Sequence, residues 1–537
     1  MDGNDGSGAC HIAMFGEPRR ARPQTYTTHH LHLFASGVLL LATLVLTAIL
    51  LLTSCQGAMD QYAGSWLTFG DDPEASQGLT QNFIQNFIHG GDPPQAAALS
   101  VATVGKLHKG WSATLPDLAD VRPILVRNVS WPDGTARDVL YLTTDNGTVL
   151  ALDGATGAKL WVVPPKNINN PKVTKSSPAA DLFNGLIYSY GLDGKVHRYR
   201  LATGQEVVGN GWPELVTRMP MSEKISSSLN LVNGYLYVTT ASFGGDAPPY
   251  QGHMVAINVN TGAAHVFNSM CSNQTHLLAP GECHDNGGGI WARPGVVVDP
   301  VTGHIFFTTA NDKFTANKGG TDWGQTVIEM TADGSKVVDS YTPENYKAVA
   351  GQDLDLGSVA PVLLPTIPQS RTPELTVQGG KEGLLRLLNR QNLSGQGGPA
   401  HVGGALQTVR VPSGCPIEAQ PIVWTDPSTG ALWLFVPNFC GLDGYKVQTS
   451  SAGVTSLQLA WSAAPQTSSP VISGGVLFAA TSKALLAFDP NSGHELWSSA
   501  LASARGDISY IHWESPIVVE GRVYCPDENS RLTMYQL

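Results

Sequence analysis

The chain has 537 residues, with 58 glycines, 35 prolines and only 14% charged residues, a composition typical of many short strands joined by turns. Its formal net charge is −11, and it has no extended lysine and arginine stripe that could neutralise a phosphate backbone. Composition and charge therefore argue against nucleic acid as a partner and favour an all-β chain with a substantial core.

The first predicted element is an apolar run within residues 34–55, long enough as a helix to cross roughly 30 Å of hydrocarbon. Three arginines precede the run and acidic residues follow it, so the positive-inside rule places segment 1–33, which we expect to be disordered, in the cytoplasm. The run ends in Leu52-Thr53-Ser54-Cys55, which resembles a bacterial lipobox with Cys55 as the lipidated residue; the alternative is an uncleaved signal anchor. Either way we expect a membrane-anchored, extracytoplasmic protein at the cell surface or in the periplasm.

The clearest repeat unit, residues 139–161, contains three strand-like runs rich in β-branched and aromatic residues. Tight turns separate the runs. Asp145-Asn146-Gly147 offers the positive φ of a hairpin turn, while Asp153 caps the next turn and Gly157 closes it. Trp161 then lies on the outer strand as a large apolar wedge. The pattern weakens along the chain and returns near the carboxyl terminus.

Self-similar four-stranded units whose strands are apolar on both faces indicate blades that stack face to face. We therefore predict an eight-bladed β-propeller over residues 110–537, preceded by a linker and lead-in segment at 56–109. The last unit is one strand short, and residues 110–115 have the pattern of the missing strand, so pairing of the two ends would close the ring and remove exposed sheet edges. The predicted blades begin near Pro123, Ser177, Ser227, Ala292, Ser358, Ala419, Ser469 and Ser515.

The cysteines outside the export signal are expected to pair, because an extracytoplasmic compartment is oxidising. Cys271 with Cys283, and Cys415 with Cys440, are close enough in sequence to staple single long loops or neighbouring strands, which leaves Cys525 unpaired. We interpret all four as disulfide cysteines.

A zinc site is the alternative for one of these pairs. Cys271, His276, Cys283 and His284 are zinc-ligating residue types within one inserted loop. Their spacing matches no compact zinc pattern, so the disulfide is the favoured interpretation and the histidines are expected to be solvated.

The repeat units resemble the quinoprotein-type (pyrroloquinoline quinone-like) repeat, Ala-x-Asp-x-x-Thr-Gly-x-x-x-Trp. Residues 151–161 and 487–497 carry the pattern best, and the resemblance extends from Trp66 onward. It implies eight stacked blades. The same repeats occur in calcium-dependent dehydrogenases of alcohols and sugars and in non-enzymatic scaffold lipoproteins of outer-membrane assembly, so the fold does not choose the activity.

The resemblance also implies candidate site residues. Asn311 resembles the calcium-binding Asn of the dehydrogenases, Asp353 and Asp355 resemble the stretch that supplies the catalytic base, and Lys381 resembles the lysine that contacts the quinone. Plainer roles exist, since Asn and Asp cap turns and a lysine at a Gly-rich hairpin is an ordinary solvated residue. Trp291 is predicted to be either a wedge between blades or part of the channel wall.

Two departures from the dehydrogenase pattern bear on function. No two cysteines are adjacent, and the loop at 239–250 has no Glu where the family's calcium ligand is expected, although Asp246 is a possible substitute. We therefore favour a membrane-tethered binding or scaffold module with a protein or glycan partner at its loop face. The alternative is a dehydrogenase of alcohols or sugars that depends on pyrroloquinoline quinone (PQQ) and Ca²⁺.

Overall fold

The structure is a computed structural model that describes residues 65–69, 99–167, 169–244, 247–500 and 508–537. The predicted segment 1–33, the apolar run 34–55 with Cys55, and Asp246 lie outside these residues. Within the part of the chain that is described, no helix is long and apolar enough to cross a membrane.

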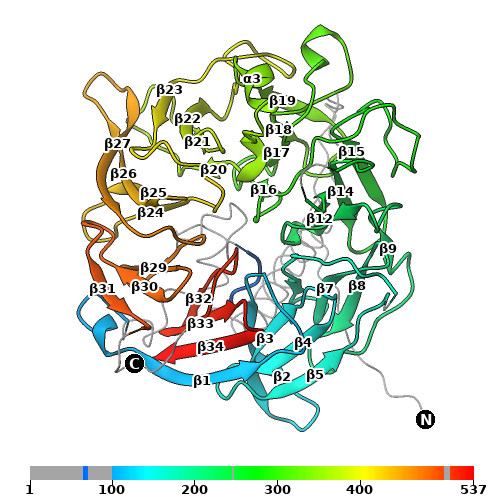
Figure 1. Ribbon diagram of the computed structural model, residues 1–537, viewed down its shortest axis with the longest axis vertical. Helices are drawn as coiled ribbons and strands as arrows, with labels where there is room; N and C mark the ends of the chain where they lie inside the picture. Colours follow the sequence, from blue (N-terminus) through cyan, green and yellow to red (C-terminus); the bar gives the residue numbers. More distant parts are fainter. Residues whose placement is uncertain (1–64, 70–98, 168, 245–246, 501–507) are drawn as a thin grey trace, which may run out of the picture.

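Eight four-stranded antiparallel sheets surround a central axis (Figure 1). The first four blades are β2 (Ile124–Ser130), β3 (Ala136–Thr143), β4 (Val149–Asp153) and β5 (Lys159–Val163); β6 (Ala179–Asp181), β7 (Leu186–Gly191), β8 (Lys195–Arg200) and β9 (Glu214–Leu215); β11 (Asn230–Val232), β12 (Tyr235–Thr239), β14 (His253–Asn258) and β15 (Ala264–Asn268); and β16 (Val297–Val298), β17 (Ile305–Thr308), β18 (Val327–Met330) and β19 (Val337–Tyr341).

The remaining four blades complete the ring, so the all-β, eight-bladed prediction is confirmed, and the first strand of every blade begins within five residues of its predicted start. These blades are β20 (Val362–Leu363), β21 (Leu375–Gln378), β22 (Leu384–Asn389) and β23 (Gln407–Arg410); β24 (Ile422–Thr425), β25 (Leu432–Asn438), β26 (Gly441–Thr449) and β27 (Thr455–Ala463); β28 (Val471–Ser473), β29 (Val476–Ala480), β30 (Leu485–Phe488) and β31 (Glu495–Ser498); and β32 (Ile517–Val519), β33 (Arg522–Asp527), β34 (Arg531–Gln536) and β1 (His108–Thr114).

The eighth blade joins the two ends of the propeller. Its outer strand β1 precedes the first blade in sequence and pairs antiparallel with β34, for example Trp111 with Met534 and Thr114 with Arg531. Figure 1 shows these blue and red strands side by side. Pairing of first with last satisfies the edge of β34, which an unclosed ring would leave open.

Tryptophans of the repeat pack against glycines of the neighbouring blade. The ring of Trp161 lies under Gly204, where an added Cβ would come within 2.8 Å of it, and Trp111 meets Gly157 of the first blade in the same way. Both glycines have positive φ, 67° and 72°. The Thr-Gly turn of one blade therefore needs glycine both for its backbone and to make room for the tryptophan of the preceding blade.

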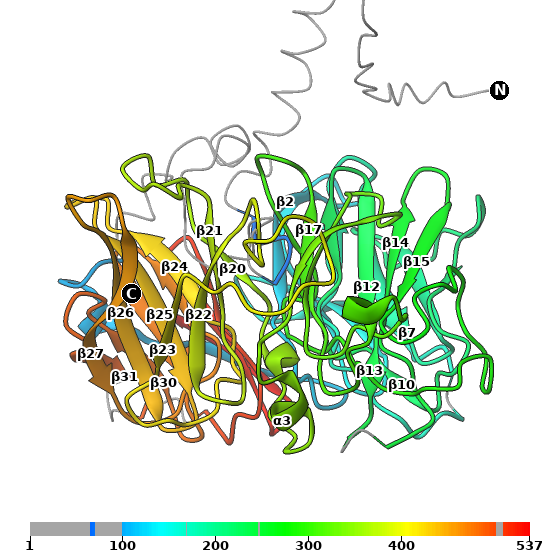
Figure 2. The same ribbon diagram turned by 90° about the horizontal axis from the view of Figure 1, so that it is seen from above.

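The segments between the blade strands, and the one before β1, carry the remaining short elements. These are a two-stranded sheet of β10 (Glu223–Lys224) and β13 (Ala241–Ser242), the helix α3 (Tyr346–Ala350), and the 3-10 turns η2 (Val104–Lys106), η3 (Ala316–Lys318) and η4 (Leu356–Ser358). Figure 2 shows α3, β10 and β13 on the same face of the ring. That face also carries the candidate site.

Candidate functional site

The four candidate residues, which are separated by up to 70 positions in sequence, meet in one cluster. Asp355 accepts a hydrogen bond from the backbone N–H of Asn311 (2.8 Å) and forms an ion pair with Lys381 (2.7 Å). Asp353 accepts a hydrogen bond from Asn311 Nδ2 (2.6 Å) and lies 3.2 Å from Lys381 Nζ. The structure thus brings together all the side chains that the resemblance singled out.

Chain segments near the axis position these residues. Asn311 follows the end of β17, Asp353 and Asp355 lie between α3 and η4, and Lys381 lies in the turn between β21 and β22. The backbone N–H of Lys381 donates to the carbonyl of Asp355 (2.9 Å), which fixes the turn between β21 and β22 to the segment before β20 of the same blade.

The two aspartates differ in exposure. Asp355 is only 3% exposed. The side chain of Asp353 is 70% exposed, and its backbone has a positive φ of 55°. Asp355 is therefore placed to orient Lys381 and Asn311, whereas Asp353 is the carboxylate that an incoming molecule meets.

Two further residues belong to the cluster. Gln325 donates from Nε2 to Asn311 Oδ1, and its Oε1 accepts from the backbone N–H of Leu356 (2.7 Å). Gln325 lies between recognisable strand patterns, so the sequence carries no signal for it. Trp291 has its ring centroid 5.5 Å from Lys381 Nζ, a cation–π contact that places its ring at the cluster.

One lysine faces two aspartates and Glu418 at the cluster. Partial burial by itself lowers the pKa of the Lys381 ammonium, but the carboxylates of Asp355 and Asp353 outweigh burial and raise that pKa above its usual value. Burial raises the pKa of Glu418, and the carboxylates of Asp355 and Asp353 raise it further, against the opposing effect of Lys381. Lys381 is therefore held fully charged.

A cavity of about 860 Å³ opens beside the cluster. Asn311 and Asp353 line it together with Asp312 and Lys313, which follow β17, and with residues from the loop that carries Cys271 and Cys283. A small molecule in this cavity would contact Asp353 directly. The candidate site is thus accessible.

A second charged cluster, the Asp120 hub, lies where the chain enters four of the blades. The fully buried Asp120 carboxylate contacts Lys175 Nζ (3.1 Å), Arg293 (3.4 Å) and His512 Nδ1 (2.8 Å). Each of the four residues lies just before the first strand of a blade. One carboxylate therefore ties together the first, second, fourth and eighth blades, a contact set for which the sequence carries no local signal.

Lys224 of β10 adds a cation beside this hub. Among the described residues no hydrogen bond or ion pair satisfies its ammonium. Burial, followed by the nearby charges of Lys175 and Arg293, lowers the pKa of Lys224 to about 8. A bound anion would relieve this repulsion.

Glu514, which lies close to Asp120, makes the stability of the protein depend on pH. Burial, together with the nearby carboxylates of Asp120 and Glu528, raises the pKa of the Glu514 carboxyl to about 9. The folded state then holds a proton that the unfolded chain releases above about pH 4.3, so the contribution of Glu514 to stability is complete below that pH and is lost toward pH 9.

We expect Glu514→Gln, which is neutral at every pH, to remove this dependence. The free energy of unfolding of the wild type, measured with urea, should fall from pH 5 to pH 8. This group contributes a slope of at most about 1.4 kcal/mol per pH unit, and the free energy of unfolding of the variant should fall less. Glu495→Gln on the exposed face of β31 is the matched control. Equal slopes for Glu514→Gln and the wild type would refute the assignment.

The loop disulfides form as predicted. Cys271 pairs with Cys283 and Cys415 with Cys440, with Cα atoms 6.0 Å apart in each pair, and Cys525 is free and buried. The zinc alternative for the first pair does not hold in this state, because disulfide sulfurs are not thiolate ligands.

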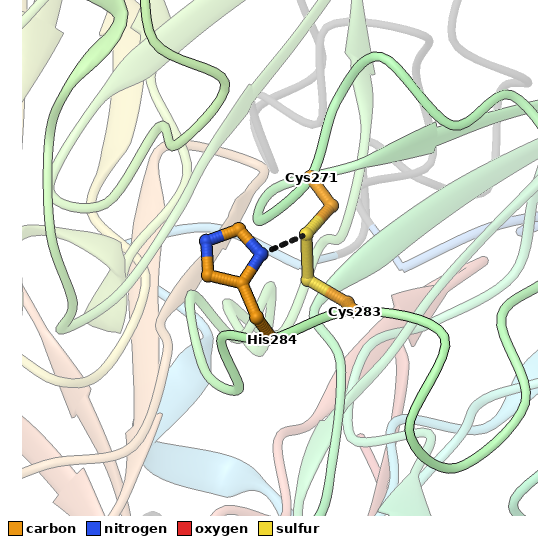
Figure 3. A group of neighbouring side chains, drawn as sticks. All are labelled: Cys271, Cys283 and His284. Carbon is orange, nitrogen blue, oxygen red and sulfur yellow. Dashed lines mark hydrogen bonds between the residues drawn. A yellow bond between two sulfur atoms is a disulfide. The ribbon is translucent and has the colours of Figure 1, made fainter.

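His284 lies against the first disulfide. Its Nδ1 is 3.7 Å from Cys271 Sγ, as Figure 3 shows. Its Nε2 is 2.9 Å from an oxygen of Asp285, while His276 lies near Glu282. The disulfide loop thus ends at the cavity wall, which His284 and Asp285 help to line.

A family model provides the decisive comparison. The model for the glucose/ethanol/alcohol dehydrogenase β-propeller domain, named PQQ, matches residues 95–396, more than half of the chain. The chain belongs to this family. A second model, described as outer membrane protein assembly factor BamB, matches residues 426–536 of the same propeller.

Solved structures similar to this family member share its fold at low sequence identity. The quinohemoprotein alcohol dehydrogenases of Pseudomonas putida HK5 and Comamonas testosteroni are 15% and 16% identical; the alignments cover 89% and 90% of this chain and 81% and 82% of theirs, each with a TM-score of 0.60. A europium-containing methanol dehydrogenase is 15% identical, with 89% of this chain and 99% of that chain covered and a TM-score of 0.61. No curated protein sequence matches the chain.

The residues at the Lys381 cluster fit PQQ, the quinone for which the family model is named. PQQ is a planar polycarboxylate, and the cluster offers it the flat ring of Trp291 and the charged Lys381. The fit to calcium is incomplete, since Ca²⁺ takes about six to eight oxygen ligands and Asn311 Oδ1 already accepts from Gln325. No chemical step is therefore assigned to calcium.

Proposed function

We propose that this propeller is a quinone-dependent dehydrogenase of a hydroxylated substrate, with its site at the Asn311, Asp353, Asp355 and Lys381 cluster. The observation that carries the proposal is the contact network itself: the residues that the family resemblance singled out lie far apart in sequence but meet in one cluster, beside an aromatic ring and at the edge of a cavity. Structural ion pairs alone would not require an exposed carboxylate at the cavity wall.

Each side chain has a distinct role in this proposal. Asp353 accepts the hydroxyl proton of a substrate in the cavity, and Asp355 holds Lys381 over Trp291. The quinone, when bound, supplies the acceptor for the hydride from the carbon that carries the hydroxyl. The product is the corresponding carbonyl compound, and the proton leaves through the open cavity.

Reconstitution tests the proposal. The purified full chain is incubated with PQQ and Ca²⁺, and bound quinone is followed by absorbance while dye reduction reports oxidation of alcohols and sugars. We expect a bound-quinone spectrum and dye reduction that requires both quinone and substrate. Lys381→Met should weaken quinone binding, because it removes the cation beside Trp291. A flat spectrum and no dye reduction would refute the dehydrogenase.

A binding module without catalysis is the second candidate. It is favoured by the internal satisfaction of the cluster, since Lys381 already has two carboxylate partners and Asn311 already has Gln325. In this case a protein or glycan would bind at the loop face. Ligand binding without quinone uptake in the reconstitution experiment would support it.

We also propose that the chain is extracytoplasmic and membrane-tethered. The two disulfides favour an oxidising compartment. The apolar run at 34–55 and Cys55 favour a tether. Mass spectrometry of the mature amino terminus tests this, because a lipidated Cys55 and an intact leading segment differ in mass, and a cleaved, unlipidated chain would refute the tether.

A further inference from the structure

The cavity beside Asp353 has features that select among hydroxylated compounds. We infer that it binds an uncharged polyhydroxylated molecule of about disaccharide size rather than a simple alcohol or a sugar acid. This inference rests on the proposed function, because it names the substrate class of the same site.

The size of the cavity favours a large substrate. The cavity volume of about 860 Å³ lies near the upper end of the range for ligand pockets, about 300–1,000 Å³. A short-chain alcohol would leave most of this space to water and would bury little surface. A molecule with two sugar rings would contact both the Asp353 side and the opposite wall formed by the disulfide loop.

The polarity of the wall is the second argument. Nine of the thirteen lining residues have polar side chains, so an apolar substrate body would desolvate them without replacing their hydrogen bonds. Among the described residues the side-chain amides of Asn286 and Gln352 have no hydrogen-bond partner within the protein. Each amide offers both a donor and an acceptor to a hydroxyl group.

Asp312 supplies a further hydrogen-bond acceptor at the cavity wall. Its Oδ1 accepts from the backbone N–H of Lys313 (2.6 Å), while Oδ2 faces the backbone of Gly287, where an added Cβ would lie only 1.9 Å away. Gly287 also has a φ of 121°, so no other residue fits there without strain. Asp312 therefore packs against Gly287, and both residues line the cavity.

Charge is the third argument. Asp285, Asp312 and Asp353 line the cavity, and the single lysine in the wall, Lys313, is already paired with Asp285 (2.5 Å). Asp285 and Asp312 are like charges close to each other in this wall. A carboxylate on the substrate would add to this repulsion, which excludes sugar acids.

Calorimetric titration of the purified full chain without quinone tests the inference. The probes are maltose, glucuronate and 1-butanol. We expect maltose to bind at least about tenfold more tightly than either of the others. Asn286→Ala and Asp312→Asn should each weaken maltose binding about tenfold, and Asp312→Asn should also narrow the discrimination against glucuronate. Asp133→Asn, on an exposed turn of the first blade, is the matched control and should change nothing.

The outcomes separate this inference from the proposed function. Equal binding of maltose and glucuronate, or maltose binding that neither variant alters, would overturn the substrate class. Maltose binding without any quinone-dependent turnover would overturn the dehydrogenase and leave the substrate class standing. Turnover of 1-butanol without maltose binding would support the dehydrogenase and overturn the substrate class.

Discussion

Asp353→Asn should lower the turnover number of the reconstituted protein about 100- to 10,000-fold. The substitution keeps the size of the side chain and its contact with Asn311, but it removes the only fully exposed carboxylate of the cluster and with it the group that accepts the substrate proton. Because Asp353 is on the surface, folding should be unaffected. Dye-linked oxidation rates at saturating substrate, with circular dichroism to check the fold, provide the measurement.

Asp133→Asn serves again as the matched control, since Asp133 is also exposed and bound to a cation, Arg137 (2.6 Å). Asp355→Asn provides a contrast. It should lower turnover and also weaken quinone binding, because it releases Lys381 (2.7 Å) from its place over Trp291. Turnover of Asp353→Asn within about threefold of the wild type would show that another group takes the proton.

Asp120→Asn should destabilise the propeller by about 3–5 kcal/mol, the usual cost when one member of a buried ion-pair network is removed. The substitution leaves Arg293 without its carboxylate and reduces Lys175 to a single partner, Asp145 (2.6 Å). Urea unfolding followed by tryptophan fluorescence at pH 7 measures the loss. Asp133→Asn should change the free energy of unfolding by less than about 0.5 kcal/mol.

The pH dependence checks the same contact. Burial alone raises the pKa of Asp120, but Arg293, the hydrogen bond from His512 and Lys175 together hold it well below its usual range. A carboxyl with a depressed folded pKa stabilises the protein above its unfolded pKa of about 4, and this contribution is lost as the pH falls below that value. The wild type should lose the contribution on acidification, and Asp120→Asn should lack it at every pH. Identical acid profiles would contradict the network.

The fold could be predicted from the sequence because its determinants are local. Asp153 hydrogen-bonds its own turn, accepting from the backbone N–H of Thr156 (2.9 Å), and Gly157 adopts the positive φ that the turn requires. These interactions depend on a few neighbouring residues and therefore recur as a readable pattern. The missing strand of the final repeat identified 110–115 as the partner of β34 in the same way.

Only part of the candidate site could be predicted from the sequence. Asn311, Asp353, Asp355 and Lys381 stand in segments similar to those of the family, but nothing in the chain states that Asp353 is exposed while Asp355 is buried. That difference arises because the turn between α3 and η4 directs one carboxylate toward the cavity and the other toward the neighbouring blade.

The sequence by itself determined the number of blades, the closing strand and the two disulfides, since turn chemistry and alternating apolar residues act over short stretches of chain. Only the tertiary structure decided that Asp120 meets Arg293, 173 positions away, and that Gln325 binds Asn311. Contacts of this kind depend on the angle at which closed blades bring their inner loops to the axis. No local pattern encodes that angle, because it results from the packing of all eight blades together.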